Sequence, residues 1–196
     1  MSSTGSRSSD TLSALVRANG WLMRVLAAVR DASVPDAWVG AGVLRDLVWG
    51  GRFGAGFDAT LVRDVDVPFF DPSDLTRAND DRVTARLGER LPEVPWEAKN
   101  QAAVHTWYPA KFGGGPVEPL RSIRDAVGTW PETATAVVVR LNADDGIEIC
   151  APLGLDDLLD GVWRRNPRRV SVEASRARLD RHRPHERWPR VTVVPP

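Results

Sequence analysis

The sequence contains little cysteine and little histidine, which excludes several kinds of site. Its 196 residues include one cysteine, Cys150, so an internal disulfide and a zinc site built on several thiolates are both excluded. His105, His182 and His185 do not stand at metal-ligand spacing with other ligating side chains. No signal-peptide pattern is found, and no apolar run approaches the ~20 residues that a membrane span needs. We therefore expect a cytoplasmic protein without membrane contact.

The net charge is zero, but the charges are unevenly distributed. Hydrophobic residues make up 42% and charged residues 27%, which is ordinary for a globular protein. Between Trp163 and Arg190 the sequence has ten arginines and only three acidic residues, Glu173, Asp180 and Glu186. Such a segment is commonly a solvated chain end, and it is also a typical footprint of RNA binding. Both interpretations stay open at this point.

The pattern of apolar residues predicts one α+β domain, in which helices pack on a mixed β-sheet. We expect a disordered N-terminus over residues 1–10, the domain over residues 11–162 and a basic tail over residues 163–196. Helices are expected at 11–30, 42–51, 75–91, 122–128 and 154–162. Strands are expected at 37–39, 64–70, 94–101, 135–141 and 147–150, the last two forming a hairpin.

Asp64 and Asp66 are the first candidate site residues. They are two positions apart on an expected strand, so both carboxylates leave the same face, while Val65 and Val67 point into the core. Two adjacent carboxylates repel each other unless a cation lies between them. Hard divalent ions prefer oxygen ligands of this kind, usually together with substrate phosphates. The alternative is a solvated strand face that carries two acids by chance.

A glycine turn at the start of the expected helix 42–51 is the second candidate. Gly40, Ala41 and Gly42 would let the backbone approach a ligand closely, and the helix N-terminus offers free N–H groups to phosphate. Arg45, one turn into the helix, could bind an anion through two N–H groups. Many tight turns use glycine for geometry alone, so this motif is weak when taken by itself.

In combination, the two motifs resemble a known superfamily. GAGVLRD followed by RDVDV is similar to the G-G-x-h-R-D and D-h-D signature of the head domain in CCA-adding enzymes and bacterial poly(A) polymerases, where h is an apolar residue. These belong to the DNA polymerase β-like nucleotidyltransferase superfamily. Ala41 stands where that signature has its first glycine. Five longer motifs between Trp38 and Asp160 resemble a bacterial family of stand-alone nucleotidyltransferases: WVGAGVLRDLVW, RDVDVPFFDP, PWEAKNQAAVH, WPETATAVVVRL and IEICAPLGLDDL.

The resemblance implies a polymerase β-like nucleotidyltransferase fold and transfer of a nucleotidyl group from an NTP. It also implies a third carboxylate beside Asp64 and Asp66, so that the three hold Mg²⁺ or Mn²⁺. Glu148 and Glu97 compete for that role, and we favour Glu148 as the catalytic and metal-binding acid because it lies on the polar side of the expected hairpin. Glu97 would then bind nucleotide together with Lys99 and Gln101, which share its strand face.

The acceptor is not identified by the sequence and could be a small molecule, RNA or protein. Two alternatives to the nucleotidyltransferase remain. One is a catalytically inactive nucleotide-binding or antitoxin-like partner. The other is an RNA terminal transferase that uses the basic tail. Trp107 is the aromatic residue that we would consider for stacking a base.

Overall fold

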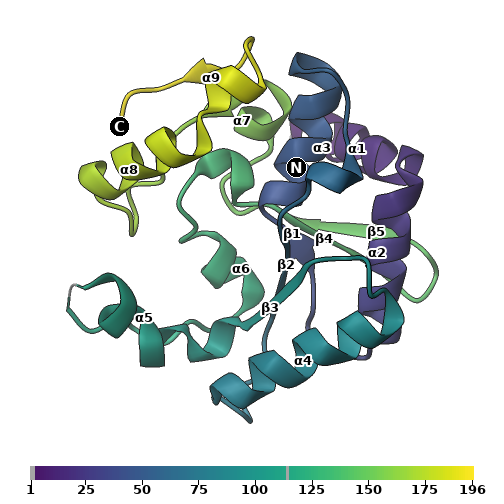
Figure 1. Ribbon diagram of the computed structural model, residues 1–196, viewed down its shortest axis with the longest axis vertical. Helices are drawn as coiled ribbons and strands as arrows, with labels where there is room; N and C mark the ends of the chain where they lie inside the picture. Colours follow the sequence, from purple (N-terminus) through teal and green to yellow (C-terminus); the bar gives the residue numbers. More distant parts are fainter. Residues whose placement is uncertain (1–2, 114) are drawn as a thin grey trace.

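The sheet at the centre of the molecule has five strands in the order β3-β2-β1-β4-β5 (Figure 1). The computed structural model describes residues 3–113 and 115–196. The strands are β1 Val39–Gly40, β2 Val65–Phe69, β3 Trp96–Asn100, β4 Val138–Leu141 and β5 Ile147–Cys150. Only the β2–β3 pair is parallel among these neighbours, and the other pairs are antiparallel. The mixed sheet with helices packed on it confirms the predicted α+β class.

One face of this sheet carries the main hydrophobic core. Val65, Val67 and Phe69 of β2 point into it and are fully buried, as the alternating pattern predicts. The helices that cover this face are α1 Ser3–Ala18, α2 Gly20–Asp31, α3 Gly42–Phe53, α4 Arg77–Arg90 and α7 Asp156–Leu159. The opposite face of β2 therefore presents Asp66 away from the core.

The opposite face of the sheet is only partly covered. Helices α5 Val104–Phe112 and α6 Ile123–Val127 contribute to two smaller apolar clusters there. Short 3-10 turns elsewhere in the chain are η1 Ala59–Leu61, η2 Gln101–Ala103 and η3 Thr133–Thr135. One cluster joins Trp38 and Val138 to α6, and the other joins Val104 to Leu120. Asp66 of β2 and Glu97 and Lys99 of β3 lie on this side.

The N-terminus differs from the expectation. Residues 3–10, expected to be disordered, belong to α1, whereas residues 1–2 lie outside the described part of the chain. The single helix expected at 11–30 is two helices bent by 97°, because the Asn19 side chain accepts a hydrogen bond from Leu22 N (2.9 Å) and starts α2. No single helix in the described residues is long and apolar enough to cross a membrane, although α1 and α2 together pass that test by length and composition only.

The segment after Val162, expected to be a tail, is folded onto the domain. It contains α8 Val172–His182, α9 Pro184–Arg187 and β7 Thr192–Val193, and β7 pairs with β6 Val162–Trp163. Trp188 packs edge-on against Trp49 at 5.2 Å between ring centres, and both are buried. Aromatic pairs of this geometry stabilise a contact beyond the area they bury.

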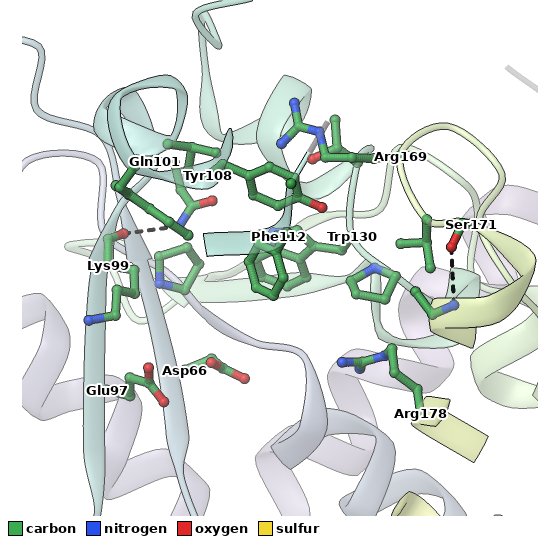
Figure 2. Close-up of a pocket in the computed structure, with 18 of the residues that line it drawn as sticks. Asp66, Glu97, Lys99, Gln101, Tyr108, Phe112, Trp130, Arg169, Ser171 and Arg178 are labelled. Atoms are coloured by element: carbon green, nitrogen blue, oxygen red, sulfur yellow. Dashed lines mark hydrogen bonds between the residues drawn. The ribbon is translucent and has the colours of Figure 1, made fainter. Parts of the chain in front are cut away.

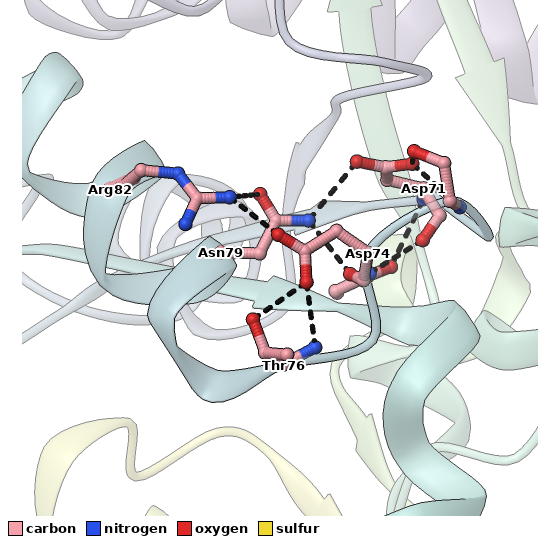
Figure 3. A network of polar contacts seen from close by, with 7 residues as sticks. Asp71, Asp74, Thr76, Asn79 and Arg82 are labelled. Atoms are coloured by element: carbon pink, nitrogen blue, oxygen red, sulfur yellow. Dashed lines mark hydrogen bonds and ion pairs between the residues drawn. The ribbon is translucent and has the colours of Figure 1, made fainter.

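A polar network fixes the adjacent ends of β2 and β3 (Figure 3). Asn100, buried at 1% exposure, accepts hydrogen bonds from the backbone N–H of Asp71 and Ala102 and donates to the carbonyls of Asp71 and Asp74. Asn79 of α4 donates to the Asp71 carboxylate and to the Asp74 carbonyl. Because the donors and acceptors of the Asn100 amide are all used, β3 is held in place where it leaves the sheet.

Candidate active site

Asp66 and Glu97 lie side by side on the open face of β2 and β3, and Asp64 is close enough to affect the pKa of Asp66. Asp66 and Glu97 are direct partners across the parallel pair, and Asp64 immediately precedes β2. Burial, together with the negative charges of Asp64 and Glu97, raises the pKa of Asp66 to about 7. The structure therefore places Asp64, Asp66 and Glu97 within electrostatic reach of one another.

Asp66 and Glu97 line a cavity of about 510 Å³ between the sheet, α5 and α8 (Figure 2). A cavity of this volume is in the range that small-molecule ligands occupy. Lys99 and Gln101 line it as well. Glu97, Lys99 and Gln101, which were predicted to bind the nucleotide, thus share one cavity with Asp66. The Gln101 amide donates to the Lys99 carbonyl at 3.1 Å, which fixes its orientation.

The cations of the cavity come from β3 and from the segment after Val162. Lys99 is partly exposed, and its Nζ lies 3.6 Å from Asp80 Oδ2. Arg178 of α8 lies across the cavity from Asp66 in Figure 2, and its positive charge lowers the pKa of Asp66. Sequence reasoning missed Arg178 because nothing local connects α8 with β2.

A buried glutamate holds Arg178 in place. Glu132 is 1% exposed and binds Arg178 through both of its carboxylate oxygens, with 2.8 Å between Arg178 Nη2 and Glu132 Oε2. A bidentate pair of this kind fixes the plane of the guanidinium group. Glu132 was not a predicted site residue, although a glutamate inside the apolar motif WPETATAVVV requires a buried cation or hydrogen-bond donors.

The predicted glycine turn lies beside Asp66, because Gly40 is the β1 residue that faces Asp66. A Cβ on Gly40 would come within 2.5 Å of the Val137 carbonyl oxygen, so this position requires glycine. Ala41 has a positive φ of 56° and gives no side-chain cap to α3. Gly40, Ala41 and Gly42 do not line the cavity itself.

Arg45 was expected to bind an anion, but its side chain does not extend into the cavity. Its side chain is buried at 5% exposure, pairs with Asp46 at 2.7 Å and lies over the rings of Trp188 (5.0 Å) and Trp163 (5.8 Å). The flanking indoles come from the segment after Val162, which the sequence prediction left unpacked. Arg45 still acts on the site at a distance, since its charge lowers the pKa of Asp66.

The position expected for Glu148 is also corrected. It lies on the edge strand β5, three strand spacings from β2, or about 14 Å at ~4.8 Å per spacing. Its carboxylate pairs with Arg140 at 2.7 Å instead. Glu148 lies beside Arg140 in the β4–β5 register, and the strand order separates it from Asp64 and Asp66.

The donor set fits a hard divalent cation in its chemistry. In the part of the chain that the structure describes, no three Asp, Glu, His or Cys side chains converge closely enough to form a preformed metal cluster. Asp64 and Glu97 nevertheless add to the effect of burial in raising the pKa of Asp66, which is the repulsion between carboxylates that a cation would relieve. Mg²⁺ is commonly bound by one or two carboxylates together with substrate phosphates, so these acids suit a cation that arrives with a nucleotide.

Comparison with known families decides the class of the protein. A family profile described as nucleotidyltransferase matches residues 27–193. The chain belongs to this nucleotidyltransferase family. An NMR structure described as revealing a CCA-adding enzyme head domain is 28% identical, with a TM-score of 0.78 over 94% of this chain and 95% of that chain. The predicted membership of the polymerase β-like nucleotidyltransferases is thereby confirmed.

Two larger enzymes share the fold of this nucleotidyltransferase. A CCA-adding enzyme in complex with CTP is 17% identical with a TM-score of 0.52, and the match covers 88% of this chain and 39% of that chain. A tRNA-processing enzyme in an apo form is 18% identical with a TM-score of 0.53, covering 88% and 43%. A comparison with curated protein sequences gives no significant match.

Proposed function

We propose that this nucleotidyltransferase moves a nucleotidyl group from an NTP to a hydroxyl or phosphate acceptor, using Asp64, Asp66 and Glu97 as the acidic triad. The observation that carries the proposal is the register of β2 and β3, which places Glu97 opposite Asp66 at the base of the cavity. Glu97 takes the role for which the sequence favoured Glu148. The CTP complex of the related CCA-adding enzyme supports an NTP as donor.

A divalent cation bound here with the nucleotide would neutralise phosphate charge and lower the pKa of the attacking hydroxyl. The side chains of the protein supply the rest. Lys99 and Arg178 flank the acids. They would bind the phosphate oxygens that face away from the acids. Glu132 holds the Arg178 guanidinium so that little reorganisation is needed when phosphate arrives.

The acceptor class stays open, and the arginine-rich segment gives little reason to choose RNA. Most of its arginines have partners within the chain. Ion pairs join Arg164 to Asp157, Arg168 to Asp125, Arg178 to Glu132 and Arg187 to Asp46. If the protein binds single-stranded RNA and this binding weakens steeply with salt, the arginines of this segment carry enough positive charge to bind RNA despite their partners.

The test is transfer of label from each α-labelled NTP, with magnesium, to protein, RNA and a panel of small hydroxyl and phosphate compounds. Asp66→Asn and Glu97→Gln should each lower the rate by at least about a hundredfold, because each removes a charge that the cation requires. Glu148→Gln is the matched control, since it removes an equivalent carboxylate from the same sheet face, and its rate should stay within about twofold.

The outcomes separate the alternatives. A large loss in Glu148→Gln with a small loss in Glu97→Gln would return the role to Glu148. Magnesium-dependent NTP binding without transfer to any acceptor class would favour the inactive nucleotide-binding partner. Unchanged magnesium-dependent affinity in Asp66→Asn would refute the acidic site altogether.

A further inference from the structure

The part of the cavity above the acids is lined by aromatic side chains. Trp107, Tyr108 and Phe112 of α5 line it together with Trp130, which precedes η3. In Figure 2, Tyr108, Phe112 and Trp130 lie across the cavity from Asp66 and Glu97. Tyr108 and Phe112 contact each other at 4.7 Å between ring centres. An acidic end and an aromatic end in one cavity match the two ends of a nucleotide.

Arg169 lies at the aromatic end. Its guanidinium carbon is 5.0 Å from the centre of the Tyr108 ring. Within residues 3–113 and 115–196, Arg169 forms neither a hydrogen bond nor an ion pair through its side chain, and burial lowers the pKa of the guanidinium. A partly buried cation whose N–H groups have no partner is able to bind an acceptor from a ligand.

The loop that carries Arg169 is held rigidly against the segment that carries Trp130. Asn166, 3% exposed, donates from its amide to the carbonyls of Gly128 and Trp130, each at 2.9 Å. Its side-chain oxygen accepts from Arg168 N at 3.1 Å. Arg169 and Trp130 are therefore placed relative to each other before any ligand binds, which reduces the entropy lost on binding.

We propose that the aromatic end of the cavity binds the nucleobase of the NTP and that Arg169 selects bases which carry an exocyclic carbonyl. This inference rests on the proposed function, because the phosphates must lie at Asp66 and Lys99 for the base to reach Arg169. The base packs on the aromatic rings, which any base can do. Arginine only donates, and guanine, cytosine and uracil each offer a carbonyl oxygen, whereas adenine accepts only through ring nitrogens and carries an amino donor where guanine has its carbonyl. The preferred donors are thus GTP, CTP or UTP over ATP.

The test is titration calorimetry of the full chain with ATP, GTP, CTP and UTP, with calcium replacing magnesium to slow turnover. Wild-type protein should bind at least one of the three carbonyl-bearing nucleotides at least about fivefold more tightly than ATP. Arg169→Gln should abolish that preference. Arg176→Gln is the matched control, because Arg176 lies exposed on α8 away from the cavity, and it should keep the preference.

Two further measurements separate this inference from the proposed function. Inorganic tripolyphosphate probes only the acidic end of the cavity. With calcium present, it should bind Arg169→Gln as tightly as wild type, and it should bind Asp66→Asn more weakly because this variant lacks a charge that the cation requires. Tyr108→Leu should weaken all four nucleotides about tenfold through lost stacking. ATP binding as tight as the other three, or a preference that survives Arg169→Gln, overturns the role of Arg169. Failure of every nucleotide and of tripolyphosphate to bind overturns the proposed function.

Discussion

Two glutamate–arginine pairs with the same chemistry differ in burial, and we predict that they differ sharply in energy. Glu132 is 1% exposed where it binds Arg178, whereas the side chains of Glu148 and Arg140 are 44% and 33% exposed. Removing one partner of a buried pair leaves an uncompensated charge, which typically costs 3–5 kcal/mol. An exposed pair contributes about 0–1 kcal/mol. The two sites therefore form an internal comparison.

The magnitudes follow from which charge is left behind. Arg178→Gln leaves Glu132 buried without its cation, so we expect a loss of about 3 kcal/mol in the free energy of unfolding. Glu132→Gln leaves Arg178, whose side chain is 29% exposed and reaches water, so about 2 kcal/mol is expected. Glu148→Gln should cost less than about 1 kcal/mol.

The assay is urea unfolding at neutral pH, followed by tryptophan fluorescence, with the Glu132→Gln/Arg178→Gln double variant completing the cycle. The double variant should be more stable than the sum of the single losses predicts, because no charge remains buried and unpaired. Equal losses at Glu132 and Glu148, or additive losses at Glu132 and Arg178, would refute the argument from burial.

Three further predictions concern single residues. Asp66→Asn should stabilise the metal-free protein by about 2–4 kcal/mol at pH 8 and by little at pH 4. The reason is that the pKa of Asp66 is raised from 3.8 to about 7, so wild type loses stability as pH rises through this window, and urea unfolding at the two pH values checks it. The pKa of His182 is lowered from 6.5 to about 4, chiefly by burial, so wild type should lose roughly 1–2 kcal/mol, after allowance for solvent screening, as pH falls from 6.5 to 4. A pH profile of His182→Gln that parallels wild type would contradict this. Ala41→Gly should raise the melting temperature by a few degrees, since it relieves about 1 kcal/mol of strain at φ 56°, and an unchanged or lower value would show that the turn is not strained.

Local patterns predicted the parts of the fold that depend on neighbouring residues. The alternation around Asp64 and Asp66 gave β2 and its polar face, and the turn before Ile147 gave the β4–β5 hairpin. The extent of α1 was not predicted, because the small polar residues before Asp10 have no apolar face that would indicate a helix. The break at Asn19 was hidden by apolar residues that continue at helical spacing on both sides.

The choice between Glu97 and Glu148 depended on strand order, which spacing along the chain does not encode. Both glutamates alternate correctly to face the site side of the sheet. β3 pairs in parallel with β2 through the crossover helix α4, whereas β4 and β1 separate β5 from β2. A strand, a helix and a second strand in sequence ordinarily form a parallel pair of neighbouring strands. The order of these elements is therefore an argument for Glu97 as the third carboxylate, independent of side-chain chemistry.

The basic segment illustrates a different limit of sequence reasoning. Its arginines look like a solvated run because each one is polar, yet Arg178 neutralises Glu132 and Arg169 lies over Tyr108. Ending the domain at Val162 would leave the buried Glu132 without its cation and would expose the face of Trp49 that Trp188 covers. It would also remove one wall of the cavity, which is lined by Arg169, Val170, Ser171, Ala174 and Arg178. The segment after Val162 is thus required for both the stability of the core and the positive side of the site.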